Sequence, residues 1–302
     1  MNPHLSKNAQ YGKVRSLILV KLAYWVALAA AAIGFYFVRD WGPIWGILSA
    51  DLIATVVIWA IGARLMNASL YDPYWSVIPP VIMVYWWSLS GFEMSANKLM
   101  MMAVILWWSV RLTTNWARDW PGLHHEDWRY QEMRADNPKL YQVSNLFGIC
   151  IFPTVLVFLA VLPAYPVLSS SGPSNLVLDI IACLAGLSAA TIQLFADGQM
   201  RHFRFKKTEG QAHAAFFTGG LWAFSRHPNY FGEVLMWFSL WLFALSAGWQ
   251  NAWTCIGWIA MLALFLFVSC PWMDRRSAAK RDGYADYIKT SSMFFPTWPK
   301  RR

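Results

Sequence analysis

Residues 176–197 read LVLDIIACLAGLSAATIQLFAD, and charge appears in this run only at Asp179 and Asp197. About 20 mostly apolar residues are enough for an α-helix to cross the hydrocarbon core of a bilayer. Nearly every position is apolar, so no amphipathic period can be read, which is typical of helices surrounded by lipid. The run therefore predicts a transmembrane helix.

Seven other stretches of the chain have the same character. They are residues 17–38, 44–66, 74–92, 98–117, 144–167, 230–247 and 252–271. The whole chain has 302 residues, of which 57% are hydrophobic and only 14% are charged, whereas a soluble domain carries about 25% charged residues. This deficit of charge excludes a soluble enzyme, and the abundance of aromatic and aliphatic residues excludes a disordered chain. We expect an all-α, polytopic integral membrane helical bundle with seven to eight transmembrane helices.

Lysine and arginine residues gather in four segments, at 1–16, 118–143, 198–229 and in the tail after 271, and the connections 168–175 and 248–251 contain none. With eight spans, all four basic segments lie on one side, which the positive-inside rule makes cytoplasmic. No repeat or linker divides the chain. We therefore expect a single domain over 1–302, in a bacterial inner membrane, with a cytoplasmic C-terminus.

The sequence predicts neither a nucleic-acid partner nor a metal site. The net charge of +9 is spread between apolar runs rather than over one face of a soluble module, so the sequence predicts no nucleic-acid partner. The four cysteines have no metal-ligand spacing, so it predicts no metal site. Membrane lipids are the expected surroundings, and the sequence leaves protein partners open.

Three pairs of polar residues stand four residues apart near the predicted cytoplasmic ends of three spans. A charged side chain at membrane depth costs about 2.5–3.5 kcal/mol, so each needs a compensating role. Local pairing would satisfy a single pair, but three pairs at one depth favour a polar pocket that opens to the cytoplasm. Asp51 and Asp179 have no such neighbours, and we expect structural roles for them. The three pairs are Arg111 with Asn115, Gln193 with Asp197, and Asn229 with Glu233.

Residues 219–233 read GGLWAFSRHPNYFGE. Pro228 suits the first position of a helix, and the first turn of that helix favours anions and acceptors. Ordinary capping would account for part of this pattern. The density of polar, aromatic and glycine residues at a membrane boundary favours a ligand site, with Arg226, His227, Asn229 and Tyr230 as candidate ligands.

The tail carries a second candidate set. Arg276, Lys280 and Tyr284 are four residues apart, and Tyr287 follows. If the segment is helical, these side chains form a basic and phenolic stripe. Attraction to anionic lipid is the alternative explanation, but a basic stripe beside a polar pocket also suits a polyphosphate ligand.

The run SRHPNYFGE, the spacing Gln193…Asp197…Arg204 and the tail Lys280…Tyr284…Tyr287…Pro296 resemble the C-terminal half of the steroid 5α-reductase family and its bacterial relatives. Sterol C14-reductases share the general pattern. The resemblance covers residues 190–302 and extends only loosely to the first half of the chain. Runs similar to RHPxYxG also occur in membrane methyltransferases of the isoprenylcysteine and phospholipid types.

The resemblance implies an NADPH-dependent reductase, with cofactor bound from the cytoplasmic side and a hydride transferred to the C=C bond of a conjugated 3-oxo-Δ4 steroid or a similar enone lipid. Gln193, Asp197 and Arg204 match the family's cofactor-binding Asn, Asp and Arg. Asn229 and Glu233 match its Asn and Glu, whereas Arg276 and Lys280 correspond only in position to its His and Tyr. We expect the full cofactor-binding set to include these residues together with Arg111, Asn115, Arg226, His227, Tyr230, Tyr284 and Tyr287.

The family's active-site pair is a Glu and a Tyr that hold the steroid carbonyl. The resemblance places Asp72 at the Glu position and Trp108 at the Tyr position, and an indole cannot deliver an acidic proton. Tyr74 and Tyr85 are nearby phenols that could replace it. Negative charge develops on the enone oxygen as the hydride arrives, so a hydrogen-bond donor there lowers the barrier. We expect Asp72, with Tyr74 or Tyr85, to supply that donor.

Two other functions remain open from the sequence. One is a membrane methyltransferase that uses S-adenosylmethionine, although that cofactor has no phosphates to explain the basic segments at 201–207 and 275–281. Such enzymes also carry a Glu-Glu pair in the tail, where this chain reads MDRRSAAK. The other is a non-catalytic lipid-binding or assembly protein, against which the clustered carboxylates argue.

Overall fold

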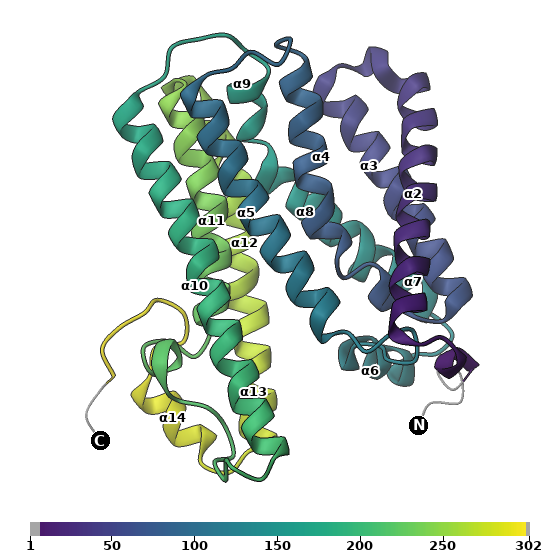
Figure 1. The fold of residues 1–302 in the computed structure, drawn as a ribbon, viewed down its shortest axis with the longest axis vertical. Coiled ribbons are helices and arrows are strands. Elements are labelled where there is room, and N and C mark those ends of the chain that lie inside the picture. Colours follow the sequence, from purple (N-terminus) through teal and green to yellow (C-terminus); the bar gives the residue numbers. More distant parts are fainter. Residues whose placement is uncertain (1–6, 300–302) are drawn as a thin grey trace. The chain divides into compact units, whose positions relative to one another are not determined.

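The computed structural model describes residues 7–299, and every regular element in this range is helical (Figure 1). Within it, five helical stretches are long and apolar enough to cross a membrane. These are Lys13–Trp41, Pro43–Leu65, Tyr141–Val161, Leu176–Thr208 and Trp249–Lys280. The expected all-α membrane bundle is confirmed, whereas a count of seven to eight spans and the orientation stay predictions.

The chain forms two compact units, which are described separately. The first contains residues 7–93, 109–161 and 168–170, and the second contains residues 94–108, 162–167 and 171–299. The helix α5 (Ala96–Asp119) contributes its N-terminal half to the second unit and its C-terminal half to the first. The prediction of one domain over the whole chain stays a prediction.

In the first unit, helix α3 packs against α2, α4 and α8. Pro43 occupies the first turn of α3, and Met66 ends the helix in the left-handed conformation, at φ 53°. The helices of this unit, besides its half of α5, are α2 (Lys13–Val38), α3 (Pro43–Leu65), α4 (Tyr74–Ser88), α6 (Trp128–Asp136), α7 (Tyr141–Ser144) and α8 (Phe152–Val161).

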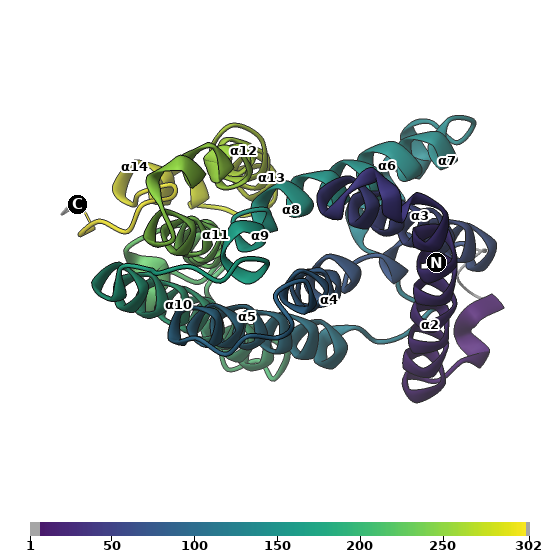
Figure 2. The same ribbon diagram turned by 90° about the horizontal axis from the view of Figure 1, so that it is seen from above.

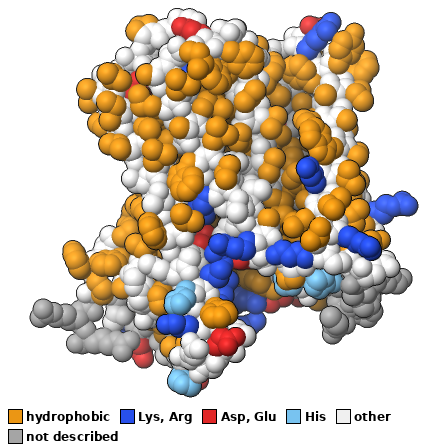
Figure 3. Space-filling model, viewed as in Figure 1, with side chains coloured by type: hydrophobic (Ala, Val, Ile, Leu, Met, Phe, Trp, Pro, Cys, Tyr) orange, Lys and Arg blue, Asp and Glu red, His pale blue; other side chains and the backbone are white. Residues whose placement is uncertain are grey.

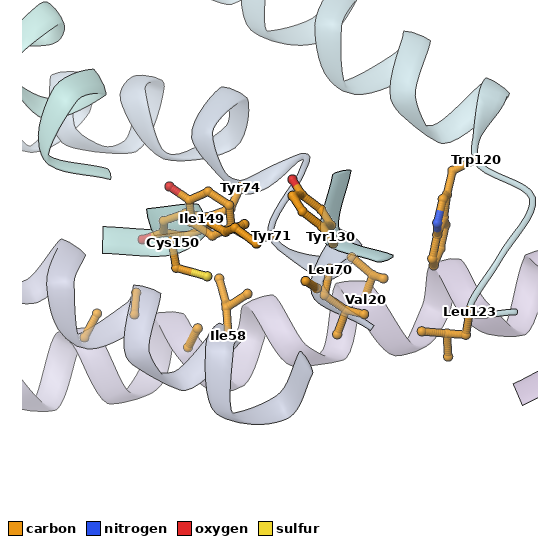
Figure 4. Close-up of a cluster of buried hydrophobic side chains, with 14 of the residues drawn as sticks. Val20, Ile58, Leu70, Tyr71, Tyr74, Trp120, Leu123, Tyr130, Ile149 and Cys150 are labelled. Carbon is orange, nitrogen blue, oxygen red and sulfur yellow. The ribbon is translucent and has the colours of Figure 1, made fainter. Parts of the chain in front are cut away.

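The core of the first unit combines small residues with aromatic ones. Ala27 and Ala31 of α2 pack with Ala50 and Ala54 of α3, and small side chains let helix backbones approach closely within a membrane. The other part of this core is aromatic: in Figure 4 the side chains of Tyr71, Tyr74, Tyr130 and Trp120 follow one another across the view, above Ile58 and Val20. The other labelled members are Val20, Ile58, Leu70, Leu123, Ile149 and Cys150.

A polar junction fixes the turn between α3 and α4 to the loop that follows α5. Asn67 Nδ2 donates hydrogen bonds to the backbone oxygens of Leu123 and His125, at 2.8 and 2.9 Å. The fully buried carboxylate of Glu126 accepts from the backbone N–H of Ala68 at 2.8 Å and from Arg134 at 2.8 Å. These bonds hold the start of α4, and with it Asp72 and Tyr74, in a defined place.

In the second unit, α11 lies between α10 and α12 (Figure 2). A π-helical turn at Phe265–Ser269 joins α12 to α13 without a break, so this stretch continues to Lys280, beyond the predicted end at 271. The helices are most of α9 (Ala164–Leu168), α10 (Leu176–Thr208), α11 (Pro228–Ser246), α12 (Ile256–Leu264), α13 (Cys270–Lys280) and α14 (Tyr284–Thr290).

Glycine allows α10 and α11 to make their close contact. A Cβ atom added at Gly232 of α11 would lie 2.8 Å from the backbone oxygen of Ala189 and 2.7 Å from Cγ of Gln193. A Cβ atom at Gly186 of α10 would lie 2.6 Å from Oγ of Ser239. The backbone oxygen cannot move aside, so the separation of the two helices depends on the missing side chain at 232.

We expect Gly232→Ala to destabilise the protein by about 1–3 kcal/mol, the usual cost of overpacking a close-packed contact. The matched control is Gly198→Ala on α10, where an added Cβ meets nothing within 4 Å and alanine favours the helix. Thermal unfolding of both variants in detergent would measure this. Equal melting temperatures for the two variants would contradict the close-contact argument.

Candidate functional site

Glu233 is the centre of a buried hydrogen-bond network in the second unit. Its Oε2 accepts from Gln193 Nε2 at 2.6 Å and from the indole N–H of Trp108 at 2.9 Å, and its Oε1 accepts from the indole N–H of Trp237 at 2.9 Å. All four side chains are buried. Trp108 comes from α5, Gln193 from α10 and the other two from α11, so the network ties three helices together.

The network continues toward the N-terminal end of α11. Gln193 Nε2 also donates to the backbone oxygen of Asn229 at 3.3 Å, and Asn229 Nδ2 donates to Asp197 Oδ1 at 3.4 Å. Gln193 Oε1 is buried and has no hydrogen-bond partner among the described residues. The structure thus brings together Gln193, Asp197, Asn229 and Glu233, which the sequence placed in one pocket.

The local sequence explains this convergence. Gln193 and Asp197 lie one turn apart on α10, and Asn229 and Glu233 lie one turn apart on α11, so each pair shares a helix face. Gly232 between them lets the two faces meet. Asp197 and Asn229 are half-buried, so the network runs from a buried carboxylate to a partly accessible edge.

A second polar cluster joins the tail to the start of α11. The Asp274 carboxylate of α13 accepts from Arg226 Nε at 3.0 Å and Nη2 at 2.9 Å, lies 3.0 Å from His227 Nε2, and accepts from the Tyr284 hydroxyl at 3.0 Å. Arg226 Nη1 also donates to the backbone oxygens of Ile288 and Ser291. We call this set, with Asp274 at its centre, the tail clamp.

Backbone pairing and aromatic contacts extend the tail clamp. The Arg226 N–H donates to the backbone oxygen of Ser292 at 2.8 Å, and the Tyr287 hydroxyl donates to that of Trp222. Burial raises the pKa of Tyr287 to about 12, so the phenol remains a donor at neutral pH. The His227 ring stacks on Tyr230 with centroids 5.3 Å apart.

The tail clamp shows what the predicted cofactor ligands of the loop and tail contact. Arg226 and His227 connect the start of α11 to Asp274 of the tail. Tyr284 joins α14 to α13 through Asp274, and Tyr287 joins α14 to the turn at Trp222. Asp274, which organises them, was missed from sequence, and its only signal was a carboxylate beside the basic run of MDRRSAAK. Three further predicted ligands also belong to the second unit: Arg276 is half-buried on α13, and Lys280 and Arg204 are exposed at the ends of α13 and α10.

Asp274→Asn should destabilise the tail, because it leaves the buried Arg226 guanidinium without its counter-charge, a change that costs about 3–5 kcal/mol. Asp282→Asn, at an exposed position, is the matched control. Hydrogen exchange of residues 284–297 would report the loss. If exchange there were the same in both variants, Asp274 would not be what holds the tail.

The first unit contains an apolar cavity of about 560 Å³. Its walls come from α2, α3, α4 and the C-terminal end of α5, and most of the side chains in them are aliphatic or aromatic. Asp51 of α3 and Tyr74 of α4 both line it. Tyr74 donates from its hydroxyl to Asp51 Oδ1 at 2.6 Å. Asp51 Oδ2 is buried and has no hydrogen-bond partner among the described residues.

Asp72 contacts a different partner from the one expected. Its Oδ1 accepts from the hydroxyl of Tyr130 at 2.5 Å, and it is not among the residues that line the cavity. Tyr85 does line the cavity, where its ring meets Phe35 edge-on with centroids 5.1 Å apart. The structure therefore pairs the predicted Tyr74 with Asp51, a residue for which the sequence suggested only a structural role.

Two predicted cofactor ligands belong to the first unit. Arg111 is buried on the C-terminal half of α5. Asn115, one turn further along the same helix, accepts at Oδ1 from Arg118 Nη2 at 3.0 Å. Gln193 and Glu233 belong to the second unit.

Asp72 should make stability depend on pH. Burial raises the pKa of its carboxyl to about 7, although Tyr130 and Arg129 both act to lower it. The folded protein then binds this proton more tightly than the unfolded chain, in which the pKa of an aspartate is about 3.9. Stability therefore falls as the pH rises from about 4 to about 7.

We expect Asp72→Asn to flatten this decline, because the amide does not titrate and its oxygen still accepts from Tyr130. Asp40→Asn, at an exposed position, should leave the slope unchanged. Melting temperatures across this pH range would test both variants. Parallel curves for the wild type and Asp72→Asn would show that Asp72 does not titrate there.

Comparison with known proteins places the chain in a family but does not give it a function. A protein of Schizosaccharomyces pombe described as uncharacterized is 27% identical over 273 residues, which are 83% of this chain and 78% of the relative. No solved structure matches the chain. The family described as "Protein of unknown function (DUF1295)" matches residues 58–291. The chain therefore belongs to the DUF1295 family, and the match includes α4, the Glu233 network and the tail clamp.

Proposed function

We propose that this protein is a membrane-embedded reductase that uses NADPH to reduce the C=C bond of a conjugated 3-oxo-Δ4 steroid or a similar enone lipid. The observation that carries the proposal is the cavity of the first unit, which combines apolar walls with one buried carboxyl–phenol pair, Asp51 and Tyr74. The resemblance of residues 190–302 to the steroid 5α-reductase family supports it.

The cavity suits a large apolar substrate. Its volume of about 560 Å³ is within the usual range of roughly 300–1,000 Å³ for small-molecule sites. Apolar walls bind a hydrocarbon skeleton in any orientation, because apolar contacts are not directional. The few polar groups therefore decide the orientation of the substrate. Hydrophobic side chains also cover most of the visible outer face of the helices (Figure 3), which lets a lipid-soluble substrate reach the protein from the bilayer.

Asp51 and Tyr74 can stabilise the charge that develops during reduction. When the β-carbon of an enone accepts a hydride, negative charge accumulates on the carbonyl oxygen, and a fixed donor there lowers the barrier. The Tyr74 hydroxyl donates to Asp51 Oδ1 and so fixes the carboxyl. Asp51 Oδ2 is the buried, unpaired atom of the pair, and we propose that a small rotation of the protonated carboxyl lets it donate to the enone oxygen.

The second unit contains residues that fit a nicotinamide cofactor. Gln193 Oε1 is a buried acceptor without a partner, which suits the N–H group of a carboxamide. Asp197 and Asn229 continue from it to a partly accessible edge, and exposed Arg204 is suited to phosphate. NADPH, when bound, supplies the hydride for the β-carbon and leaves as NADP⁺, while a proton added at the α-carbon completes the saturated ketone.

The geometry favours Asp51 over Asp72 as the partner of the substrate oxygen. Asp51 lines the cavity and has an unpaired oxygen, whereas Asp72 lies outside the cavity lining and is bonded to Tyr130. Both carboxyls adjoin the start of α4. Comparing the turnover of Asp51→Asn with that of Asp72→Asn therefore decides which of them contacts the substrate oxygen.

The test uses the purified full chain in lipid nanodiscs with NADPH and a 3-oxo-Δ4 steroid. We expect loss of NADPH absorbance and a product that has gained two hydrogen atoms. Asp51→Asn and Tyr74→Phe should each lower kcat by about 100-fold or more, the usual effect of removing a donor from a developing oxyanion. Asp72→Asn is the matched control and should retain turnover.

Two outcomes would reject the proposal. One is the absence of any reduced product from the wild type with intact binding of the steroid. The other is S-adenosylmethionine, rather than NADPH, in the small molecules released from the purified protein, because that cofactor belongs to the methyltransferase alternative. Full activity in Asp51→Asn would remove Asp51 from the site and leave the reductase assignment resting on the measured reduction and on the resemblance alone.

A further inference from the structure

Three buried hydroxyl groups of the first unit form a cluster next to the pair of Asp51 and Tyr74. Oγ1 of Thr154, on α8, lies 2.8 Å from Oγ1 of Thr55 on α3 and 2.8 Å from the hydroxyl of Tyr71. All three side chains are buried, and the described residues that line the cavity do not include them. A substrate in the cavity therefore meets this hydroxyl cluster only through a neighbouring residue.

Both members of the pair adjoin the hydroxyl cluster. Thr55 comes one turn after Asp51 on α3, so the two side chains share a helix face. The ring of Tyr71 lies beside that of Tyr74, with centroids 5.6 Å apart, and Thr55 hydrogen-bonds the Tyr74 hydroxyl. The cluster and the pair therefore form one row of polar groups, which runs from Tyr71 through Thr154, Thr55 and Tyr74 to Asp51.

Counting protons gives this row a direction. A hydroxyl group has one proton to donate, and it can accept as well. Tyr74 donates its proton to Asp51 Oδ1 at 2.6 Å, so toward Thr55 it can only accept. Thr55 therefore donates to Tyr74 and accepts from Thr154. Thr154 has then given its proton to Thr55 and accepts from Tyr71. Each hydroxyl donates to the next one, and hydrogen bonds aligned in this way strengthen one another.

We propose that Thr154 is a positioning residue for the reduction. Its hydroxyl keeps Thr55 turned as a donor to Tyr74. The proton of Tyr74 then stays on Oδ1 of Asp51, and the proton of the carboxyl itself is confined to Oδ2, the atom assigned to the enone oxygen. This inference rests on the proposed function and adds the residue that determines which carboxyl oxygen carries the proton.

Loss of the Thr154 hydroxyl would remove this constraint. Thr55 would lack the donor from which it accepts, and it would be free to accept the proton of Tyr74 instead. Oδ1 of Asp51 would then lose its hydrogen bond, and the carboxyl proton would divide between Oδ1 and Oδ2. A smaller fraction of bound substrate would meet a donor, so kcat would fall. The apolar walls would bind the hydrocarbon skeleton as before, so KM would not change.

Attachment of helices is the alternative role for the hydroxyl cluster, because hydroxyl groups that bond across helices stabilise membrane bundles. The cluster does join α8 to α3 and to the segment before α4. A purely structural role predicts a lower melting temperature, but it predicts no change in the hydrogen bond that the substrate carbonyl receives. A measurement on the bound carbonyl therefore separates the two roles.

The test records the infrared spectrum of a 3-oxo-Δ4 steroid, isotope-labelled at the ketone carbon, bound to the full chain in nanodiscs without NADPH. A carbonyl that accepts a hydrogen bond absorbs at a lower frequency. We expect the wild type to lower the carbonyl frequency. Thr154→Val has nearly the same shape but no hydroxyl, and it should lose most of this lowering, whereas Thr154→Ser should retain it.

Thr254→Val is the matched control. Thr254 is also fully buried, and its hydroxyl donates to the backbone oxygen of Asn251 at 2.8 Å in the second unit. Its loss should lower the melting temperature without moving the carbonyl frequency. Thr55→Val removes the donor to Tyr74 directly and should act as Thr154→Val does, so this variant gives the result if Thr154→Val does not fold.

Turnover provides a second measurement. With NADPH present, Thr154→Val should lower kcat by about tenfold, the effect of roughly one hydrogen bond, and leave KM unchanged. Thr154→Ser should restore most of the rate.

The results separate this inference from the proposed function. An unshifted carbonyl in the wild type, or the same carbonyl frequency in the wild type, Thr154→Val and Thr55→Val, would overturn the inference even if the steroid is reduced. A shift that depends on the Thr154 hydroxyl would support it even if no NADPH is consumed. In that case the reductase assignment alone would fail, and the pair would remain a carbonyl-binding site for another reaction.

Discussion

A carboxylate among apolar helices must find its hydrogen-bond donors within the protein, because lipid provides none. This constraint organises the second unit. Glu233 takes its donors from two indoles and an amide, and Asp274 takes an arginine, a histidine and a tyrosine. Each carboxylate thereby fixes helices or segments that are distant in sequence.

Asp51 differs from these two carboxylates because only one of its oxygens has a donor. It has one phenol on Oδ1 and nothing on Oδ2, and it faces a cavity instead of packed side chains. Asp179 also has an unpaired oxygen, but it stands in the first turn of α10, where the helix dipole favours negative charge. Asp51 lies in the interior of α3 and has no such compensation, which is why we propose a ligand as the partner of its unpaired oxygen.

The tail clamp changes how the motif SRHPNYFGE is understood. Its Arg226 and His227 hold Asp274 and so attach the tail to the start of α11, whereas its Asn229 and Glu233 belong to the network with Gln193. One short run thus performs two tasks on either side of Pro228. The residues before the proline fix the tail, and those after it form the polar edge that we propose for the cofactor.

The sequence by itself determined the class of protein and the convergence of α10 with α11. Apolar composition leaves no other environment for the helices, and residues four apart share a helix face regardless of context, so Gln193, Asp197, Asn229 and Glu233 were predicted together. Only the tertiary structure decided the partners of Tyr74 and Arg226. Asp51 and Asp274 are 23 and 48 residues away from them, and helix spacing says nothing about contacts between separate helices. A side chain pointing into a cavity has the same sequence signature as one buried in a core, because both are surrounded by apolar residues.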